Sequence, residues 1–581
     1  MIKIKINGQE YQAQEGESVL QVAIREGLDI PHLCYHEDLP IEANCRLCLV
    51  KVNGQIETSC TLKVKEGLEV ESQDQEVIKL RLENLELLLA DHQQHCPKCQ
   101  ENLPCPAKKL IEKYGVSGNK YPRRRLNIAP EDLGTAAEFD PEICVNCNRC
   151  VNTCAKIGIN YLELEGKGAQ SHLQATANPK IDCIYCGQCT LHCPVMAIRE
   201  KNHLKNVEAI LADQDKILIA QMAPSVRASI GEEFALPVGS DVTGEMYTAL
   251  RQLGFNYIFD VNFGADITTM VEAQELVERI KNNGVLPMFT SCCPAWVKFL
   301  EFYYPELIPH LTTSRSPQIH AGGAYKTWWA KQQNIDPEKI IVVSLMPCTS
   351  KKYEASLAKL NLTITKPNGE KISVKPVDFV LTTREAAALL KKRQIDLKTL
   401  DKSEADSLAE HSGAAAIYGA SGGVMESALR TAAKLLTGQD LPRLEFAAVR
   451  GMQGLKKTLV RLNLADGQEI QLKVAVVSTP KNARIVLNEL KKDPHAYDYI
   501  EFMACPGGCI GGGGQPLSTT EAIVAERIKA LYQIDQNKQM RTAHANPQVQ
   551  EFLKFLEDDE FGRQIEKQVL HTSYQAKQRG E

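Results

Sequence analysis

The stretch "GVLPMFTSCCPAW", residues 284–296, ends an apolar run on two adjacent cysteines. Neighbouring side chains of an extended segment point to opposite sides, so one compact metal cluster does not easily bind both Cys292 and Cys293. Two later apolar runs also end on cysteines, "KIIVVSLMPC" (339–348) and "DYIEFMACPGGC" (498–509). Because ligands gather beyond the carboxyl ends of strands in open α/β sheets, we expect one cleft that holds a cluster. Its expected ligands are Cys293, Cys348, Cys505 and Cys509.

Apolar runs alternate with helical stretches from about residue 210 onward, which predicts an α/β architecture with largely buried sheets. The polar insertion "LTITKPNGEKISVKP" (362–376) indicates a surface hairpin or loop, and the chain after Pro516 indicates helices with charged faces. Further strands are expected in "KILIAQMAP" (216–224), "NYIFDVNFGAD" (256–266), "LEFAAVRG" (444–451) and "LKVAVVST" (472–479).

Length and composition limit the classes of function. A chain of 581 residues is long enough for several domains. Its 67 basic and 72 acidic residues give a net charge of −5, which argues against a nucleic-acid partner. No run approaches the ~20 apolar residues that span a bilayer, and the N-terminus lacks an apolar signal core, so we expect a cytoplasmic protein without a membrane partner. Under those conditions, 20 cysteines favour metal ligands over disulfides.

Two segments, "CVNCNRCVNTC" (144–154) and "CIYCGQCTLHC" (183–193), share the spacing C-x2-C-x2-C-x3-C. This spacing is typical of bacterial ferredoxins, in which the fourth cysteine of each motif binds the other [4Fe–4S] cluster. A zinc site would show paired CxxC units instead. One predicted cluster takes Cys144, Cys147, Cys150 and Cys193, and the other takes Cys154, Cys183, Cys186 and Cys189.

Two looser motifs come earlier in the chain. One has the gaps of a modified plant-type [2Fe–2S] site, for which zinc is the alternative. The other reads H-x3-C-x2-C-x5-C, and its His92 stands one helical turn before Cys96, whereas His95 is poorly placed. A neutral imidazole in place of a thiolate should raise the potential of that [4Fe–4S] cluster. The ligands are Cys34, Cys45, Cys48 and Cys60 for the first site, and His92, Cys96, Cys99 and Cys105 for the second.

With these motifs in order, the chain resembles the [FeFe]-hydrogenases of the long monomeric clostridial type over essentially its whole length. The carrying segments are "TSCCPAW", "LMPCTSKKYEA" and "FMACPGGCIGGGGQP". The resemblance implies reversible formation of H2 from two protons and two electrons at an H-cluster. That cofactor is a [4Fe–4S] cubane bridged by a cysteine sulfur to a two-iron unit with CO, CN and azadithiolate ligands. Four accessory clusters would relay the electrons.

The resemblance also implies partners: ferredoxin or flavodoxin as the electron partner, and maturation proteins. One alternative is the catalytic subunit of an NAD(P)-linked or electron-bifurcating complex. A non-catalytic electron-transfer subunit, or an H2-sensing or iron–sulfur assembly relative, is a weaker alternative, because such proteins lack the full set of pocket residues.

Site residues follow from the same resemblance. The cubane would be held by Cys293, Cys348, Cys505 and the bridging Cys509. Nineteen of the 20 cysteines are then ligands, and the remaining Cys292 would exchange protons with the azadithiolate nitrogen. Around the two-iron unit the resemblance implies Lys351 and Ser225 as hydrogen-bond donors to the cyanides, Met346 and Met503 as apolar walls, and Pro224 and Gln318 as further pocket residues.

A proton route is expected from Cys292 toward the surface. Glu272, Glu275 and Arg279 are spaced i, i+3 and i+7, so they share one face of a predicted helix. By resemblance they form a relay together with a hydroxyl, which here is Thr312 in place of the family's usual serine.

The sequence predicts a multidomain α+β and α/β protein of four parts. These are a β-grasp [2Fe–2S] domain (1–76), a small helical domain with the His-ligated [4Fe–4S] cluster (77–125), a bacterial 2[4Fe–4S] ferredoxin domain (126–208) and a large two-lobed α/β H-cluster domain (209–581).

Overall fold

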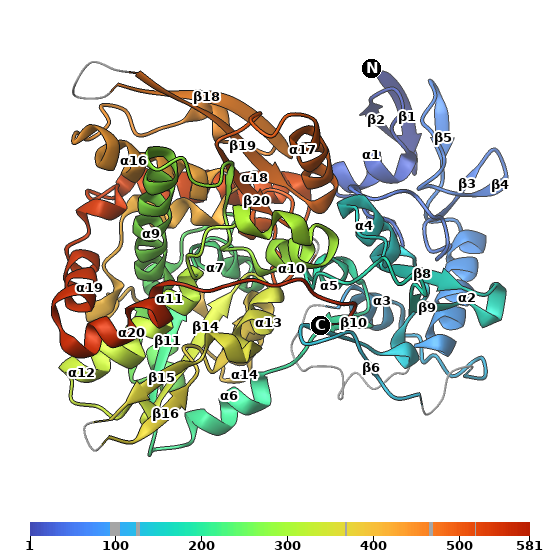
Figure 1. Ribbon diagram of the computed structural model, residues 1–581. Helices are drawn as coiled ribbons and strands as arrows, with labels where there is room; N and C mark the ends of the chain where they lie inside the picture. The colour runs from blue at the N-terminus through green and yellow to red at the C-terminus, as the bar shows by residue number, and fades with distance from the viewer. Residues whose placement is uncertain (93–104, 124–127, 367–368, 464–468, 518, 581) are drawn as a thin grey trace.

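The computed structural model describes residues 1–92, 105–123, 128–366, 369–463, 469–517 and 519–580 (Figure 1). The chain has a mixed α/β fold, with a large body at one side and a smaller N-terminal part at the other. In the described part of the chain, no helix is long and apolar enough to cross a membrane.

The N-terminal part is built on a hairpin that begins with the stretch "IKIKING". Alternate residues of the first strand are buried, so Ile4 and Ile6 face the core with Val19 and Val50. Ser18 and Gln21 form a capping box that begins the short helix after the hairpin. The elements are β1 (Ile2–Ile6), β2 (Gln9–Ala13), α1 (Val19–Arg25), β3 (Leu49–Val52), β4 (Gln55–Thr58) and β5 (Leu68–Val70), with sheet order β2-β1-β5 and a separate β3-β4 pair.

A leucine-rich helix follows, α2 (Gln75–Asp91), which Asp74 caps through two backbone N–H groups. The helix ends at Asp91, and the backbone of the next residue, His92, is extended. The helix α3 (Pro106–Tyr114) starts directly after Cys105.

The region that carries the two ferredoxin-type motifs consists of short strands around two helices that follow the cysteine loops. In each loop an asparagine or glycine with positive φ, Asn148 or Gly187, precedes the helix. The elements are β6 (Glu131–Asp132), β7 (Ala137–Phe139), α4 (Arg149–Ile157), β8 (Leu162–Glu165), β9 (His172–Ala175), α5 (Gln188–His192), β10 (Ile198–Glu200) and α6 (Leu204–Leu211).

Two four-stranded sheets organise the large body. The first is entirely parallel, with the order β12-β11-β14-β17, and the second has the order β13-β20-β19-β18, of which only the β18–β19 pair is antiparallel. Their strands are β11 (Ile217–Met222), β12 (Tyr257–Asp260), β13 (Met288–Phe289), β14 (Ile340–Met346), β17 (Phe379–Thr382), β18 (Leu455–Asn463), β19 (Glu469–Ser478) and β20 (Tyr499–Met503).

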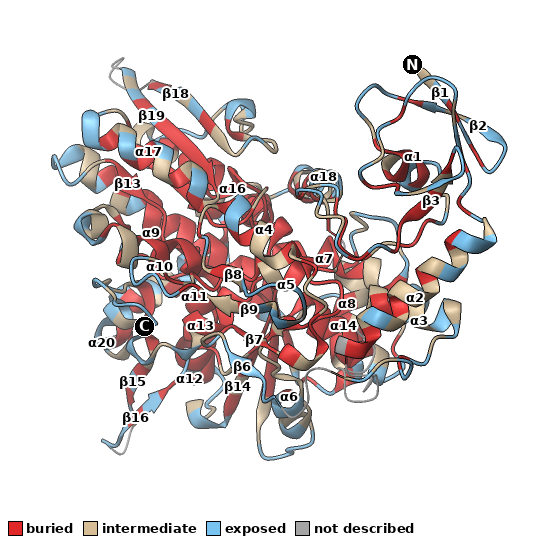
Figure 2. Cartoon of the chain, turned by 90° about the vertical axis from the view of Figure 1, so that its right-hand side faces the viewer, coloured by how far each residue is buried: buried red, intermediate tan, exposed pale blue. Residues whose placement is uncertain are grey.

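Long buried helices pack with these sheets, and Figure 2 shows that most of this body is buried. The longest is α9 (Val261–Lys281), which begins at a side-chain cap from Asp260 and packs on α11 and α16. The other helices are α7 (Pro224–Arg227), α8 (Thr243–Leu253), α10 (Pro294–Tyr303), α11 (Pro317–Ala324), α12 (Ala330–Gln332), α13 (Ser350–Ser356), α14 (Thr383–Lys392), α15 (Gly413–Ala416), α16 (Gly423–Thr437) and α17 (Pro480–Lys492).

The chain after Pro516 forms the predicted helices α18 (Glu521–Asn537), α19 (Pro547–Asp558) and α20 (Glu560–Leu570). The final segment, dark red in Figure 1, then crosses the large body toward the ferredoxin-type region. Its Gly580 N–H donates to Asp182 Oδ2 at 3.2 Å, and Arg579 donates to the carbonyl of Thr176.

A buried ion pair also joins the two regions. The Arg384 guanidinium on α14 contacts Glu200 at 2.6 Å, with both side chains fully buried, and also donates to the carbonyl of Gly513 and to the Thr190 hydroxyl. Because Arg384 lies in the large body and Glu200 and Thr190 lie in the ferredoxin-type region, these directional contacts hold the two regions in one relative orientation.

Two strand predictions need correction, whereas the predicted insertion is indeed a hairpin, β15 (Leu362–Thr365) with β16 (Lys371–Val374). The segment 444–451 forms a single 3₁₀ turn, because Arg430 takes up the carbonyl of Leu444 and Arg541 pairs with Glu445 at its start. Segment 256–266 is a strand only to Asp260, whose side chain accepts from Asn262 N–H and begins α9.

Candidate active site and iron–sulfur sites

The expected cleft lies where the carboxyl ends of strands from both sheets meet. Cys293 follows β13 and Cys505 follows β20 in one sheet, whereas Cys348 follows β14 in the other. With Cys509, these thiols lie close enough to act on one another electrostatically, and burial together with the neighbouring thiols raises the pKa of Cys505 and Cys509. With no metal bound, the raised pKa values keep these thiols protonated, whereas an iron–sulfur cluster would hold all four as thiolates.

The glycine loop between the last two of these cysteines needs positive φ. Gly507 and Gly508 have φ of 72° and 95°. A Cβ on Gly508 would lie 2.6 Å from the backbone nitrogen of Ser421, so the loop and the 417–423 segment touch through main chain alone.

A cavity of about 60 Å³ is lined by two of these four cysteines, Cys348 and Cys509. All six pocket residues expected from the sequence line it, and so does Cys292. The lining residues are Ala223, Pro224, Ser225, Val261, Ala265, Cys292, Pro317, Gln318, Met346, Pro347, Cys348, Lys351, Tyr418, Gly419, Met503 and Cys509.

Lys351 supplies the positive charge at this cavity. Its ammonium donates to the carbonyl of Cys292 at 3.0 Å and to Glu354 Oε2 at 2.9 Å. Burial by itself would lower the pKa of Lys351, but Glu354 and the neighbouring thiols outweigh it and raise the pKa above its ordinary value. The side chain therefore stays cationic, and Gln318 holds the same Glu354 oxygen at 2.7 Å.

Two buried polar atoms at the cavity, Ser225 Oγ and Gln318 Oε1, have no hydrogen-bond partner among the described residues. Such orphaned groups are costly unless a bound group pairs with them. Together with the Lys351 ammonium and the apolar Met346 and Met503, they fit a small metal unit that carries polar, anionic ligands.

The sequence reasoning missed part of the wall. Tyr418 and Gly419 come from "IYGASGG" (417–423), and Ala265 comes from α9. A Cβ on Gly419 would approach Ser225 Oγ to 2.5 Å, so only glycine leaves that hydroxyl in place. The three glycines of this buried segment, Gly419, Gly422 and Gly423, were the available signal for close backbone approach.

Cys292 is buried beside the cavity, and burial, with Glu272 and Cys509 as neighbours, raises the pKa of its thiol. Glu272 is fully buried on α9, and burial, followed by the charge of Glu275, raises its pKa to about 8. One Glu272 oxygen accepts from the Tyr499 hydroxyl at 3.3 Å, and the other has no hydrogen-bond partner among the residues described. Glu272 is therefore a protonated acid at neutral pH.

The outer three residues of the expected route form one hydrogen-bonded group. Thr312 Oγ1 donates to Glu275 Oε2 at 2.7 Å, and Arg279 contacts Glu275 Oε1 at 2.6 Å. The structure thus brings Thr312, Glu275 and Arg279 together, with Glu272 one helical turn inward on α9.

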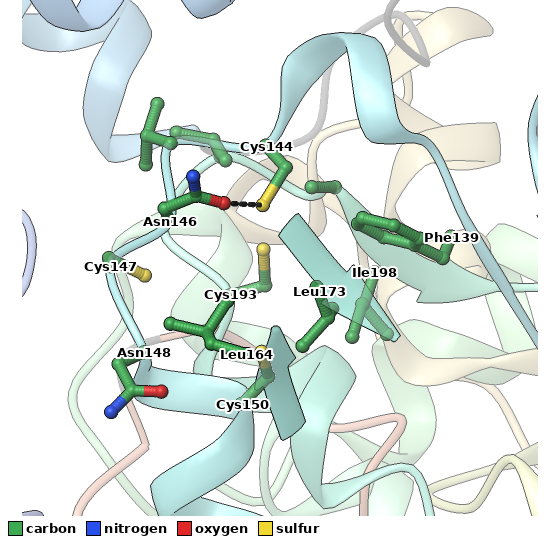
Figure 3. Close-up of a pocket in the computed structure, with 13 residues that line it drawn as sticks. Phe139, Cys144, Asn146, Cys147, Asn148, Cys150, Leu164, Leu173, Cys193 and Ile198 are labelled. Atoms are coloured by element: carbon green, nitrogen blue, oxygen red, sulfur yellow. Dashed lines mark hydrogen bonds between the residues drawn. The ribbon is translucent and has the colours of Figure 1, made fainter. Parts of the chain in front are cut away.

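The ferredoxin-type cysteines group across the two motifs. Cys144, Cys147, Cys150 and Cys193 line one cavity (Figure 3). The thiol of Cys144 donates to Asn146 Oδ1 at 3.5 Å, the contact dashed in that view. In each motif the first two cysteines lie on a loop and the third lies in the first turn of the following helix. The fourth lies farther along that helix, as Cys154 does, or directly after it, as Cys193 does, and so reaches the partner loop.

A second cavity holds Cys154 with Cys183, Cys186 and Cys189. This set adjoins the active site, because Cys186 and Cys505 are electrostatic neighbours and Gln188 Nε2 donates to the Gly511 carbonyl at 2.8 Å. A Cβ on Gly513 would lie 2.4 Å from the Gly187 carbonyl carbon, so the two loops meet through glycine backbone.

The N-terminal cysteines are close to one another in two contacting pairs. Cys34 interacts with Cys45 and Cys48 with Cys60, and Cys45 acts electrostatically on Cys48 and Cys60. The Arg149 guanidinium, next to Cys150, donates to the carbonyl of Leu33 at 3.2 Å, so this site adjoins the cavity of Figure 3.

The remaining site is described in part. Cys96, Cys99 and His95 lie outside the described residues. His92 is buried and its Nδ1 is 2.8 Å from the Ile143 carbonyl, which leaves Nε2 as the free nitrogen. Cys105 Sγ donates to the Pro194 carbonyl at 3.8 Å. Because α2 ends at Asp91 and the His92 backbone is extended, His92 itself does not lie in a helical turn, and the predicted position of Cys96 relative to it falls outside the described residues.

Family comparisons agree with this arrangement. Residues 216–513 match the iron only hydrogenase large subunit, C-terminal domain, and residues 521–577 match the iron hydrogenase small subunit. Residues 1–75 match a 2Fe-2S iron-sulfur cluster binding domain, and residues 81–120 match the NADH-ubiquinone oxidoreductase-G iron-sulfur binding region.

Similar proteins cover nearly the whole chain. The NADP-reducing hydrogenase subunit HndD of Solidesulfovibrio fructosivorans is 37% identical over 100% of both chains. Iron hydrogenase 1 of Clostridium pasteurianum is 38% identical over 94% of this chain and 95% of its own.

Among solved structures, the apo [FeFe]-hydrogenase HydA1 from Chlamydomonas reinhardtii has 36% identity and a TM-score of 0.56, and the match covers 65% of this chain and 99% of that one. The family match spans more than half of the chain and includes every strand end that carries an active-site cysteine. The chain therefore belongs to the [FeFe]-hydrogenase family and is an iron–sulfur enzyme that interconverts H2 with protons and electrons.

Proposed function

We propose that the chain is an H2-forming and H2-oxidising enzyme with an H-cluster in the cavity beside Cys293, Cys348, Cys505 and Cys509. One observation carries the proposal: four thiols from three distant segments are electrostatic neighbours beside a cavity that holds a buried Lys351 cation and a Ser225 hydroxyl without a partner among the described residues. Cys509, which lines the cavity itself, would hold the cubane on the side of the two-iron unit. When bound, this cofactor supplies the metal chemistry that joins or splits H2.

The protein would position that cofactor, place a positive charge beside it and exclude water from it. Lys351 holds its proton and offers N–H donors to anionic ligands, and Ser225 offers a hydroxyl. Met346 and Met503 exclude water with soft, apolar side chains. Pro224 and Gln318 complete the wall, and Gln318 also holds Glu354 in place beside Lys351.

Protons are proposed to pass between Cys292 and the surface through Glu272, Thr312 and Glu275. Glu272 is an uncharged acid at pH 7 and can both give and accept a proton in its buried setting. Its oxygen without a hydrogen-bond partner among the described residues would accept from a bridging water that connects it to Thr312.

Electrons are proposed to reach the active site along a branched route. The [2Fe–2S] site adjoins the cysteine set of Figure 3 through the hydrogen bond from Arg149 to Leu33. The His92 site adjoins the same set through the contacts of His92 with Ile143 and of Cys105 with Pro194. The second ferredoxin-type set then leads to Cys505. Two entrances fit a chain that accepts electrons from more than one partner surface.

The iron content tests the cofactor set. Five iron–sulfur centres and a two-iron unit sum to about 20 iron atoms per chain in fully matured protein. Stoichiometric zinc, or far less iron in a mature and active sample, contradicts the proposal. Protein made without maturation proteins should contain the cubanes and produce no H2.

The histidine ligand is tested by its variants. His92→Ala should change the electron paramagnetic resonance spectrum of one [4Fe–4S] cluster, because Nε2 is the nitrogen left free by the Ile143 contact. His95→Ala is the matched control and should leave the spectrum unchanged. If only the His95→Ala variant has an altered spectrum, His95 is the ligand and the assignment to His92 is wrong.

For the electron partner we propose ferredoxin or flavodoxin, in a cytoplasmic protein. A second candidate, the catalytic subunit of an NAD(P)-linked complex, rests on the full-length similarity to an NADP-reducing hydrogenase subunit. Pull-down from native extract followed by mass spectrometry separates the two: recovery of a flavin-containing subunit favours the complex, and H2 evolution with reduced ferredoxin by the isolated chain favours the first.

We further propose that the four expected domains are units of the fold: a β-grasp domain (1–76), a helical domain (77–125), a ferredoxin domain (126–208) and a two-lobed catalytic domain (209–581). The separate N-terminal sheets and the two four-stranded sheets of the large body support this division.

A further inference from the structure

The outer end of the proton route depends on which group meets the solvent. Arg279 stands there, but its N–H groups point to Glu275 and to the carbonyls of Val285, His310 and Leu311. A guanidinium does not release its proton in proteins, because its pKa lies above ~12. Arg279 therefore orients Glu275 and is unsuited to pass protons inward.

A second set of contacts reaches the same carboxylate from the other side. The Thr313 hydroxyl donates to Glu275 Oε2 at 3.0 Å, and the Thr313 N–H donates to the same oxygen at 2.9 Å. The Thr313 hydroxyl is also 2.9 Å from His571 Nδ1. Thr313 is exposed and His571 is half-buried, so this branch opens to water.

We propose that His571 delivers protons from solvent to Glu275 through the Thr313 hydroxyl and is the entry of the proton route. This inference rests on the relay through Glu275 and Thr312 in the proposed function. It adds a residue from the C-terminal helices to a route whose other members lie on α9 and around β13.

The transfer balances without any further reactant. The His571 imidazolium gives its Nδ1 proton to Thr313 Oγ1, while the hydroxyl proton of Thr313 moves to Glu275 Oε2. Neutral His571 and protonated Glu275 result, and His571 regains its proton from water. Glu275 Oε2 also accepts from the Thr312 hydroxyl, so the proton arrives at the oxygen that faces the inner part of the route.

The surroundings of His571 suit this role. Burial lowers the pKa of His571 below its ordinary value; Glu275 and Glu278 on α9 and Glu566 on α20 oppose that shift only in part, and Arg315 favours the neutral ring. The ring is therefore mainly neutral at neutral pH, and it can take a proton from water and pass it on.

The main chain fixes the imidazole in position. Thr572 N–H donates to the Thr313 carbonyl at 2.7 Å, and the Arg315 Nε donates to the carbonyl of His571 at 2.9 Å. Ser314 and His571 form a β-bridge. Because the backbone is anchored on both sides of His571, the distance between the imidazole and the Thr313 hydroxyl is held constant.

The first test compares His571→Gln with His495→Gln in mature enzyme. Glutamine keeps a hydrogen bond to Thr313 and cannot titrate. We expect His571→Gln to lose about tenfold in H2 evolution in dilute buffer, with a flattened pH profile between pH 6 and 8, and to recover with added imidazole. The exposed His495 is the control and should behave as wild type. Turnover within twofold of wild type, or no rescue, overturns the proposal.

The second test needs no two-iron unit. Histidine-selective nuclear magnetic resonance on unmatured protein, with His571→Gln for assignment, follows the His571 titration. Glu275→Gln should lower the pKa of His571, because it removes a facing carboxylate, and Thr313→Val should alter its Nδ1 shift whereas Thr313→Ser should not. An unchanged titration in Glu275→Gln and an unchanged shift in Thr313→Val overturn the contact.

The two levels of the proposal are separable. If Glu275→Gln leaves turnover intact, the relay itself is wrong. If Glu275→Gln slows turnover while His571→Gln does not, the relay stands and protons enter at Glu275 directly from water, which overturns only the role of His571.

Discussion

Glu272 and Glu275 lie one turn apart on α9 and have opposite surroundings. The Glu272 carboxyl is fully buried, with one oxygen unpaired and a pKa raised to about 8. The Glu275 carboxylate accepts hydrogen bonds on both oxygens, from Arg279 on one and from Thr312 and Thr313 on the other. The same type of side chain is thus a buried, protonated acid at position 272 and a carboxylate with hydrogen bonds to both oxygens at position 275.

The difference suggests how one helix would divide the proposed proton route into an inner and an outer half. The inner half, Cys292 and Glu272, is poor in partners, so each group holds its proton and can exchange it. The outer half is rich in partners, which fix the geometry and stabilise negative charge. Variants should therefore have the largest effect inside and smaller effects toward the surface.

The largest effect is expected for Cys292→Ser. A serine hydroxyl nearly matches the thiol in shape but is far less acidic, so H2 turnover should fall by about two to three orders of magnitude. The carbonyl and cyanide infrared bands should remain, because the proposed ligand set does not include Cys292. Turnover and infrared spectra from one sample check both statements.

Two further variants serve as comparisons for Cys292→Ser. Cys293→Ser should instead distort or abolish the cubane, and Cys292→Asp should keep part of the activity, because burial raises the pKa of a carboxyl toward neutrality. Near-normal turnover in Cys292→Ser would remove the proton role, and absent infrared bands would make Cys292 a structural residue.

Glu272→Gln should cost about a hundredfold in turnover, since an amide does not exchange protons in this way. In wild type, the infrared band of a protonated carboxyl should persist at pH 7 and vanish as the pH rises through about 8. A raised pKa makes the charged form costly, so wild-type stability falls from about pH 4.5 up to pH 8 relative to the neutral variant. A band that disappears near pH 4.5 contradicts the buried-acid description.

Thr312→Val should slow turnover by about tenfold, because it removes the hydroxyl that donates to Glu275 at 2.7 Å and keeps the volume. Thr312→Ser is the matched control and should be at least as active as wild type, since serine retains the hydroxyl and rotates more freely about χ1. Equal rates for the valine and serine variants would exclude this hydroxyl from the route.

The smallest effect is expected for Arg279→Lys, a decrease of about two- to threefold. Lysine keeps the charge beside Glu275 but loses the multiple hydrogen bonds to backbone carbonyls around Leu311. The pH profile should be unchanged, because neither side chain titrates near neutrality. A shifted profile would show that Arg279 itself takes part in proton transfer.

Local patterns predicted much of the fold. Strand ends at Phe289, Met346 and Met503 follow from apolar runs, and the ferredoxin-type loops follow from cysteine spacing, because such features depend on neighbours in the chain. The error at 444–451 has a tertiary cause, since Arg430 and Arg541 bind that segment from other helices.

The sequence by itself determined the family, the chemistry of the site and the residue types that serve it, because cysteine spacing and strand-end motifs are local signals. Tertiary structure alone decided that Tyr418, Gly419 and Ala265 complete the pocket and that His571 meets Thr313, 258 residues away. It also decided the contrast between Glu272 and Glu275. Burial and hydrogen-bond partners belong to the packed fold, and no sequence spacing records them.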